Sequence, residues 1–510
     1  MVAKNEIPVI EINTSVQEGQ IWSFIKPAYL LIREDILVGW SDRECFFLLI
    51  FVLVILDKLR PYLRASLKSL CRMCTTNNCK SIIPQKDLVT IEKLRFQEAK
   101  RIQNLANNKF IVGLPEVGWK EKPIVSRLEA FSEEEMKPLN EGKYSCSTYS
   151  TRRDIRDISE KASALFLFTN IQFYDRHQRS KQLEMEIVSM CLKMFKAPAS
   201  GCGLTTYGGS ESIMLAILAH KRFFENEKGV KKPEIIFPET AHASFWKACE
   251  FFGIVPRVID VDRQTGLCSI GQYRELINKN TILLVASCPS IAFGLIDPVA
   301  ELDDLAGEFE VGLFLDCCLG GFLGPFCEDF NYNYGEICNF KHKNVTSICC
   351  DPHKYGLSPK GCSVLLFSNI ELQKALYFGK TDWCGYLYGT ATFLGSKGAS
   401  LIAASWAVMM YNGRQGYANS TKAIIEGREK VATQINAIEE LEVIGEPKLG
   451  NMAFRSTDKS FNIFYLANYM ASIGWKLVPT PKYQTIRFLV HPNNLPHLDQ
   501  LCSFIREGVK

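Results

Sequence analysis

A lysine in a turn rich in glycine and proline is the strongest candidate for covalent chemistry in this sequence. The segment VTSICCDPHKYGLSPKG places His353 and Lys354 at the end of an apolar stretch, and Lys360 follows six residues after Lys354. A lysine amine that is partly desolvated can be nucleophilic near neutral pH and can form a Schiff base with an aldehyde. Most lysines are only solvated, so this interpretation depends on the residues that accompany Lys354.

Two further residues could bind an aromatic ring at its edge and at its face. Asp316 follows the apolar run 311–315 and precedes CCLGGF, and open α/β sheets bind ligands beside the carboxyl ends of their strands. Its carboxylate could pair with a protonated ring nitrogen, or it could only cap a helix. His242, in ETAHASFWKA, follows a predicted strand. Its imidazole could stack on a ring, or it could be an ordinary core histidine.

The segment TTYGGSES offers a place for a phosphate group. Gly208 and Gly209 allow a close approach of the backbone, and Ser210 is expected to cap the amphipathic helix that follows. The exposed N–H groups at such a helix start favour a dianion. This motif is common by itself. The order of phosphate turn, histidine, strand-end aspartate and lysine is far more specific, and it is the set that a pyridoxal 5'-phosphate enzyme requires.

Alternating helices and short apolar strands must position these residues from about residue 143 onward. Periodicity predicts helices over 181–195 and 211–224, and apolar runs predict strands over 234–237, 257–261, 281–286 and 312–316. This alternation indicates an α/β fold with a large, mostly parallel sheet. From about residue 397, a long helical stretch precedes strand-like pieces, which indicates a small C-terminal α+β domain.

The composition is that of a folded protein without a polyanion-binding face. Of 510 residues, 47% are hydrophobic and 22% are charged, and the net charge is only +4. These values exclude disordered, collagen-like and coiled-coil classes and argue against nucleic-acid binding. The 19 cysteines are scattered over a long chain, which favours reduced thiols in the cytosol. Cys71, Cys74 and Cys79 lack a second ligand pair at zinc-finger spacing, and no metal site is predicted.

The N-terminal hundred residues differ from the rest. Residues 45–56, CFFLLIFVLVIL, carry no charge, but a helix of this length spans roughly 18 Å of a bilayer core of roughly 30 Å. Extension back to Ile36 reaches a spanning length and places Asp42, Arg43 and Glu44 in the membrane. Residues 58–80 contain six basic and no acidic residues, which is typical of a cytoplasmic flank. We expect a membrane anchor here, and a buried helix of the globular core is the alternative.

The chain resembles the sphingosine-1-phosphate lyase family, within the group II pyridoxal-phosphate-dependent decarboxylase superfamily, from about Gly142 to the C-terminus. The resemblance is carried by GKYSCSTY, TTYGGSESIMLA, ETAHASFWKA, GLIDPVAEL, LDCCLGGFLGPF, DPHKYG with its second lysine, and TDWCGYLYGT. It implies the fold type I of pyridoxal-phosphate-dependent transferases. It also implies retro-aldol cleavage of a phosphorylated long-chain base to a fatty aldehyde and phosphoethanolamine.

The resemblance assigns roles to individual residues. It implies that Lys354 bears the cofactor as a Schiff base, that Asp316 holds the pyridinium proton, and that His242 stacks on the ring. The remaining cofactor contacts that it implies are Gly208, Gly209, Ser210 and His353. Tyr149, Ser147 and Lys360 are the implied ligands of the substrate phosphate, and Tyr149 also lies near the site of proton transfer.

Three departures from the family pattern fall on segments that the resemblance assigns to the substrate. Phe173 begins Phe-Tyr-Asp where the family has His-Pro-Asp, although Asn170 is retained. Phe293 stands where a histidine is common, and Lys397 replaces an arginine, which exchanges a bidentate guanidinium for a point charge. His177 could replace the missing histidine if its segment is helical. We expect these changes to affect substrate identity or rate more than cofactor binding.

These expectations define four segments and three functional alternatives. An N-terminal segment with the anchor (1–60) precedes a basic and helical linker (61–142), a large cofactor-binding domain (143–396) and a small domain (397–510). The resemblance predicts a homodimer with shared active sites, located at the endoplasmic reticulum membrane with the catalytic domain facing the cytosol. The alternatives to a lyase are a pyridoxal-phosphate-dependent amino-acid decarboxylase and a cofactor-binding paralogue with weak or no turnover.

Overall fold

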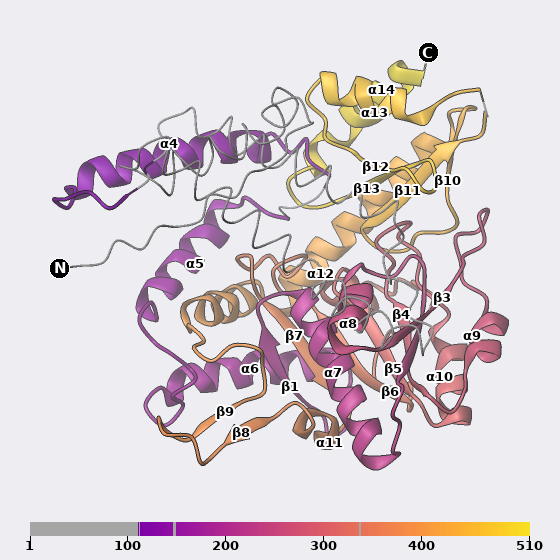
Figure 1. The fold of residues 1–510 in the computed structure, drawn as a ribbon. Helices are drawn as coiled ribbons and strands as arrows, with labels where there is room; N and C mark the ends of the chain where they lie inside the picture. Colours follow the sequence, from indigo (N-terminus) through magenta and orange to yellow (C-terminus); the bar gives the residue numbers. More distant parts are fainter. Residues whose placement is uncertain (1–110, 112, 146–148, 336–337, 459, 510) are drawn as a thin grey trace, which may run out of the picture. The chain divides into compact units, whose positions relative to one another are not determined.

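A seven-stranded sheet lies at the centre of the part of the chain that the computed structural model describes, namely residues 111, 113–145, 149–335, 338–458 and 460–509 (Figure 1). The strand order is β1-β7-β6-β5-β4-β2-β3. Within this described sheet, β7 runs antiparallel to β1 and β6, and the other neighbouring strands are parallel to one another. The strands are β1 (Cys202–Thr206), β2 (Glu234–Pro238), β3 (Val255–Ile259), β4 (Thr281–Ser287), β5 (Gly312–Cys317), β6 (Val345–Cys350) and β7 (Ser363–Phe367).

The expected α/β fold with its large, mostly parallel sheet is thus confirmed. Three of the four predicted strands match β2, β4 and β5 to within one residue at each end. The fourth strand was predicted over 257–261, and β3 begins and ends two residues earlier. Of the β3 residues, Ile259 is buried and the others are partly or fully exposed, so an apolar run was a weak guide to its bounds. The helix predicted over 211–224 corresponds to α7, which begins two residues earlier and ends three residues later.

Helices cover both faces of the sheet and create two hydrophobic cores. Side chains alternate between the faces along each strand, so Phe314 of β5 packs in one core while Leu313 and Leu315 pack in the other. The first core contains α7 (Gly209–Glu227), α8 (Ser244–Phe252) and α11 (Ile370–Lys374). The second contains residues of α6 (Gln178–Met194), α9 (Ile270–Leu276) and α10 (Val299–Phe309).

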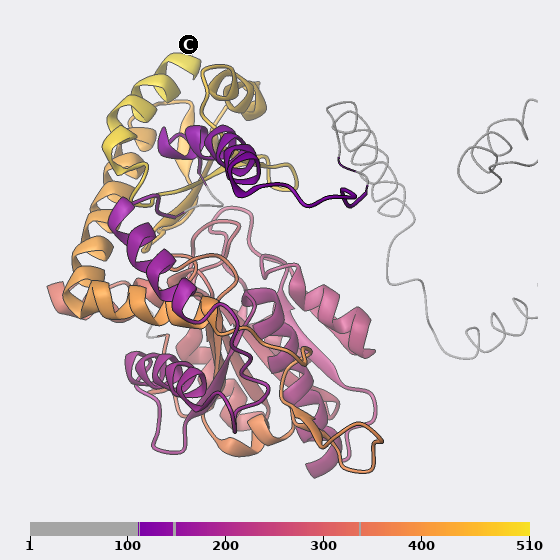
Figure 2. The ribbon, with the colours of Figure 1, turned by 90° about the vertical axis from the view of Figure 1, so that its left-hand side faces the viewer.

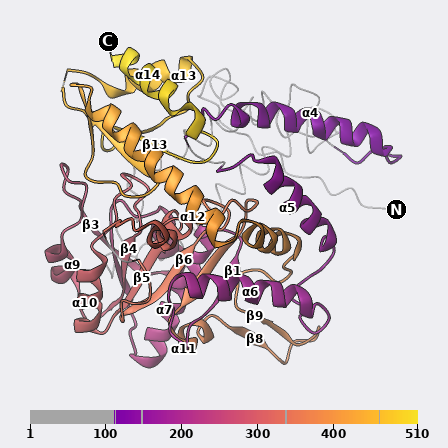
Figure 3. The same cartoon turned by 180° about the vertical axis from the view of Figure 1, so that it is seen from behind.

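A long helix connects the large sheet to a smaller C-terminal layer. Helix α12 (Ser400–Asn436) bends at Gly413, which adopts a φ of 56° that favours glycine. Figures 2 and 3 show α12 passing from the central sheet toward the C-terminal helices. The small sheet has the order β10-β11-β13-β12. Its elements are β10 (Leu441–Val443), β11 (Asn451–Ser456), α13 (Ile463–Ser472), β12 (Val478–Thr480), β13 (Thr485–Leu489) and α14 (Leu498–Val509).

The remaining described elements lie at the edges of these layers. Helix α5 (Arg153–Leu165) packs along α12 through Ala162, Ala403 and Ala407, whereas the described residues of α4 (Glu121–Asn140) are nowhere buried. The other elements are the hairpin β8 (Phe378–Lys380) and β9 (Tyr388–Thr390) and the 3-10 turns η1 (Gly320–Phe322), η2 (Gly324–Phe330) and η3 (Leu495–His497).

Two of the sequence predictions lie outside the described residues. The anchor predicted over 36–56 is one of them, and the predicted phosphate ligand Ser147 is the other. None of the helices in the described part of the chain is both long enough and apolar enough to cross a membrane.

Candidate active site

The turn after β6 places Lys354 against a buried carboxylate. Nζ of Lys354 lies 2.9 Å from Oδ2 of Asp351, whose side chain is completely buried. Burial lowers the pKa of Lys354, but the negative charge of Asp351, with smaller contributions from Cys318, Tyr149 and Asp316, holds that pKa well above its usual value. The Asp351 carboxyl has a lowered pKa despite its burial, because Lys354 and His353 are close. Lys354 is therefore an ammonium here and must lose a proton before it can react.

Sequence reasoning missed Asp351. The residue stands in the quoted DPHKYG segment, three positions before the lysine, and the backbone N–H of Lys354 donates to the Asp351 carbonyl at 3.0 Å. An acid and a lysine three residues apart in one tight turn can pair. That spacing was the available signal for this contact.

The phosphate turn starts helix α7 two residues earlier than expected. The N-cap is Gly208, with a φ of 136°, and this glycine has no side chain that could cap the helix. The predicted role of Ser210 as the N-cap is thus wrong, because Ser210 lies inside the first turn. The Ser210 hydroxyl instead accepts a hydrogen bond from the Ser244 hydroxyl at 2.7 Å. A Cβ on Gly209 would lie 2.6 Å from the Cys318 sulfur and 2.9 Å from Oδ2 of Asp351, so this turn has no room for a side chain.

Ser244 also orients His242. The backbone N–H of Ser244 donates to Nδ1 of His242 at 3.2 Å, and the Ser244 hydroxyl is 2.9 Å from the same nitrogen. Because Nδ1 accepts a hydrogen bond from the backbone N–H of Ser244, the proton of a neutral His242 imidazole lies on Nε2. The serine therefore joins the phosphate turn and His242 into one hydrogen-bonded unit.

Asp316 lies at the carboxyl edge of the sheet, as predicted. It is the penultimate residue of β5, and its side chain is buried beside β6. Oδ1 accepts the backbone N–H of Cys318 at 3.1 Å, and the Cys349 sulfur is 3.5 Å away. The carboxylate is thus fixed by the strand end itself.

Two cavities meet at Lys354. The smaller, of about 310 Å³, is lined by Tyr207, Gly208, Gly209, Ser210, Glu211, Ile213, His242, Cys318, Asp351, His353 and Lys354. Nδ1 of His353 and Oε1 of Glu211 are buried in this region with no hydrogen-bond partner within the described chain. The groups of this region fit pyridoxal 5'-phosphate. The start of the helix suits its phosphate, the amine suits its aldehyde, and the imidazole and the nearby Asp316 carboxylate suit its ring.

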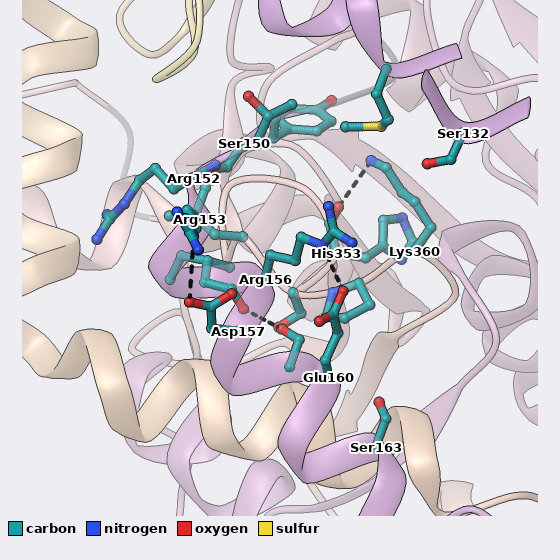
Figure 4. Close-up of a pocket in the computed structure, with 18 of the residues that line it drawn as sticks. Ser132, Ser150, Arg152, Arg153, Arg156, Asp157, Glu160, Ser163, His353 and Lys360 are labelled. Carbon is teal, nitrogen blue, oxygen red and sulfur yellow. Dashed lines mark hydrogen bonds and ion pairs between the residues drawn. The ribbon is translucent and has the colours of Figure 1, made fainter. Parts of the chain in front are cut away.

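The larger cavity, of about 1390 Å³, is lined by Tyr149 and Lys360, two of the three predicted ligands of the substrate phosphate, and Figure 4 shows Lys360 in it. Nζ of Lys360 donates to the His353 carbonyl at 3.0 Å and lies 4.5 Å from the centre of the Tyr149 ring. Tyr149 packs edge-on against Tyr355, with 4.8 Å between the ring centres. His353 and Lys354 line this cavity as well as the smaller one, so a molecule in either cavity can reach the lysine.

Helix α5 and its N-cap add ion pairs to the larger cavity that the sequence did not indicate. Arg152, Arg153 and Arg156 line the larger cavity. Each pairs with an acid on the same helix, for example Arg156 with Glu160 at 2.6 Å. Figure 4 shows Arg156, Asp157 and Glu160 together on the α5 wall. These residues lie in a regular helix and carry no motif.

The three departures from the family pattern lie apart from both cavities in the described chain. Phe173 contacts Tyr386, with 5.9 Å between ring centres, and Phe293 is buried edge-on against Tyr483. His177 is the N-cap of α6 and follows a hydrogen-bonded turn, not a helix. The proposed helical replacement by His177 is therefore wrong.

Lys397 is a buried structural cation. Its Nζ lies 2.5 Å from Oε1 of Glu184 and 2.7 Å from the Thr205 carbonyl. The expectation that Lys397 belongs to the substrate side is not met in this chain, because its charge is used to neutralise Glu184. The two lysines Lys397 and Lys181 overcome the effect of burial on Glu184 and lower its pKa to about 2.

Comparisons with known proteins agree with this geometry. The pyridoxal-dependent decarboxylase conserved domain matches residues 167–457. Sphingosine-1-phosphate lyase of Saccharomyces cerevisiae is 35% identical over 372 residues, which cover 72% of this chain and 63% of the yeast protein. Sphingosine-1-phosphate lyase 1 of Rattus norvegicus is 34% identical over 429 residues, which cover 82% of this chain and 74% of the rat protein. The aligned part thus spans just under two thirds of the yeast relative and nearly three quarters of the rat relative.

Solved structures give the same result at the level of the fold. The sphingosine-1-phosphate lyase of Burkholderia pseudomallei matches with a TM-score of 0.77 and 30% identity, over 79% of this chain and 94% of that one. A glutamate decarboxylase of Lactobacillus brevis matches with a TM-score of 0.67 and 19% identity, over 79% of this chain and 96% of that one. The second match reflects a common fold alone.

Proposed function

Because this chain belongs to the sphingosine-1-phosphate lyase family of the pyridoxal-dependent decarboxylases, we propose that it cleaves phosphorylated long-chain bases to a fatty aldehyde and phosphoethanolamine with pyridoxal 5'-phosphate as its cofactor. One observation carries the proposal. Lys354 lies where a cavity with a cofactor donor set meets a second cavity that holds Tyr149 and Lys360.

The smaller cavity supplies the residues that we assign to the cofactor. The start of α7 at Gly209 and Ser210 would hold its phosphate, and Lys354 its aldehyde carbon. Asp316 would keep a proton on the ring nitrogen, because a buried carboxylate at hydrogen-bond distance favours the charged form of its partner. His242, oriented by Ser244, is the residue that we assign to the face of the ring. When bound, pyridoxal phosphate supplies an electron-accepting ring that weakens bonds at the substrate carbon bearing the amine.

The larger cavity supplies the residues that we assign to the substrate. Lys360 provides a positive charge for the phosphate group, and Tyr149, buried directly beneath its Nζ, provides a phenol for proton transfer. The ammonium of Lys354 must lose its proton before its amine can attack the aldehyde of the cofactor. The Asp351 carboxylate, 2.9 Å from Nζ, would hold the lysine in position during this step. Arg152, Arg153 and Arg156 also line this cavity, but each is paired with an acid, so we assign the phosphate of the substrate to Lys360.

The central experiment is an assay of the purified protein with sphingosine 1-phosphate and pyridoxal phosphate, in which fatty aldehyde is measured. We expect aldehyde and phosphoethanolamine in equal amounts. Release of carbon dioxide from an amino acid, with no aldehyde from the lipid, would instead identify an amino-acid decarboxylase. Bound cofactor with no turnover of either substrate class would identify a paralogue without catalytic activity.

The assignment of Lys354 is tested separately from turnover. Borohydride reduction of the protein with its cofactor, followed by peptide mass spectrometry, should find the reduced cofactor on Lys354. The matched control is Lys360→Ala, which should leave that label in place. Label on another lysine, or label that survives in Lys354→Ala, contradicts the assignment.

We also propose that residues 36–56 anchor the protein in the endoplasmic reticulum membrane, with the catalytic part in the cytosol. The support is the apolar run 45–56 and its basic flank in the sequence. Alkaline carbonate extraction should leave the protein in the membrane pellet, and added protease should digest the catalytic part of sealed microsomes. Release by carbonate, or full protection from protease, refutes the proposed anchor or its orientation.

A further inference from the structure

Two cysteines and the aspartate assigned to the cofactor share one face of the central sheet. Asp316 of β5 is in register with Cys349 of β6, and Cys318 follows Asp316 by two residues. Because side chains alternate along a strand, Cys317 and Cys350 point to the opposite face. The packing agrees, since Cys318 and Cys349 belong to the core beside α7 and α8, while Cys317 and Cys350 belong to the other core.

The distances within this trio are close to those that a single ion requires. The Cys318 sulfur is 3.3 Å from the Cys349 sulfur, which is 3.5 Å from Oδ1 of Asp316. A tetrahedral ion with metal–sulfur bonds of about 2.3 Å and a metal–oxygen bond of about 2.1 Å separates two sulfurs by roughly 3.8 Å, and a sulfur from an oxygen by roughly 3.6 Å. One ligand atom from each of the three residues lies within 4.8 Å of the other two. If the two sulfurs moved about half an ångström farther apart, the three ligand atoms would have the spacing of a metal site.

We propose that Asp316, Cys318 and Cys349 bind one thiophilic divalent cation, Zn²⁺ or Cd²⁺, when the cofactor is absent. Thiolates and a carboxylate are ligands that these ions accept, and a fourth position can be filled by water from the adjoining cavity. Each thiol would release its proton to solvent as it binds the ion. The prediction of no metal site overlooked this trio because its two cysteines lie 31 residues apart, on different strands and without motif spacing.

Cation and cofactor would exclude each other, and this part of the proposal rests on the role proposed for Asp316. An ion that uses the Asp316 carboxylate removes the partner of the ring nitrogen. Cys318 lines the 310 Å³ cavity together with Asp351 and Lys354, so the ion would also reach the space assigned to the cofactor. The carboxylates of Asp316 and Asp351 favour a cation there, and the ammonium of Lys354 opposes it.

Cadmium titration of the full-length apoprotein tests the site without relying on turnover. Charge transfer from thiolate to cadmium absorbs in the ultraviolet and counts the equivalents that are bound to sulfur. We expect the unmutated apoprotein to bind one equivalent more than Cys349→Ser. The matched control Cys350→Ser changes the neighbouring cysteine on the opposite face and should keep that equivalent. Equal counts for the unmutated protein and Cys349→Ser overturn the proposal.

A second measurement needs no variant to fold. Cadmium-113 NMR of the unmutated apoprotein should show one resonance at the shift of an ion with two sulfur ligands, and pyridoxal phosphate should remove it. Cofactor uptake is followed by its own visible absorbance. A resonance that survives full cofactor loading refutes the mutual exclusion. A protein that takes up no cofactor contradicts the proposed function, and the cadmium count still decides whether the cation site exists.

Discussion

At the scale of single residues, Lys360 is the residue to which we assign the phosphate group of the substrate. We expect Lys360→Ala to raise KM for sphingosine 1-phosphate by about 10- to 100-fold, because a hydrogen bond to a charged group contributes about 1.5–3 kcal/mol and each 1.4 kcal/mol is tenfold. The change in kcat should be much smaller, since Lys354 and Asp316 are untouched. Steady-state kinetics of aldehyde release provide the measurement.

The matched control for Lys360 is Lys374→Ala. Lys374 is an exposed lysine on α11 that pairs with Glu371, and its loss should leave both kinetic constants unchanged. The same loss of rate with phosphorylated and with unphosphorylated long-chain bases would show that Lys360 does not recognise the phosphate.

The site residues differ in how far the sequence could predict them. Asp316 lies at the end of β5, and His242 and Lys354 follow β2 and β6. Parallel strands end at one edge of a sheet, so the proximity of these residues could be expected. Asp351 directly follows β6 and could have been expected beside Lys354 from the same argument. Ser244 could not be assigned in this way, because its role depends on hydrogen bonds to His242 and Ser210 at the start of α8, and a serine at a helix start is not unusual.

At the scale of the elements, the ion pair between Lys397 and Glu184 ties the loop before α12 to α6 and β1. Removal of one member of a buried pair leaves the other charge uncompensated. We expect Lys397→Met to lower the free energy of unfolding by about 2–4 kcal/mol, since Lys181 still contacts Glu184 at 2.7 Å. Denaturant unfolding of the apoprotein measures this loss.

Two variants separate pairing from packing at this position. Lys181→Met removes a half-exposed lysine from the same carboxylate and should cost about 1 kcal/mol or less. The double variant Glu184→Gln/Lys397→Met has no uncompensated charge and should recover part of the loss. A Lys397→Met protein that is as stable as Lys181→Met would show that the pair does not hold the loop.

Asp297, between β4 and α10, gives the fold a dependence on pH. Burial raises the pKa of its carboxyl to about 7, although Oδ2 accepts the Ser287 N–H at 2.7 Å. The folded protein therefore keeps a proton that the unfolded chain loses near pH 4, and stability falls as the pH rises from about 4 to about 7. The full effect of this group is on the order of a few kcal/mol. Asp297→Asn cannot ionise, so its thermal midpoint should decline less over this range.

The control for this pH effect is Asp304→Asn, which changes an exposed acid of α10. Its thermal midpoint should follow the unmutated protein at each pH. If Asp297→Asn loses as much stability between pH 4 and pH 7 as the unmutated protein does, Asp297 is not the group that titrates.

At the scale of the whole molecule, sequence periodicity predicts the large sheet well, but it does not predict which residues outside the sheet pack on the small domain. Alternation of strands and helices predicts the central sheet because each apolar run is buried on both sides. It does not predict that residues 143–145 join the small domain, where the Ser145 N–H donates to the Lys476 carbonyl at 3.1 Å. That contact joins positions more than 300 residues apart in the sequence, and local patterns contain no information about it.

We expect the homodimer that the family resemblance predicts to bury the exposed apolar side chains of the hairpin β8–β9. Leu387 is 74% exposed, and Phe378, Trp383 and Tyr386 are each about half exposed. Monomeric proteins rarely expose a contiguous apolar patch of this kind. Light scattering of the purified protein, corrected for bound detergent, should give a mass of about twice 57.7 kDa. Leu387→Asp places a charge in this patch and should shift the protein toward the monomer. The control Tyr465→Asp changes an equally exposed aromatic residue on α13 and should remain a dimer. A monomeric unmutated protein, or equal dissociation of both variants, would refute a dimer built on this hairpin.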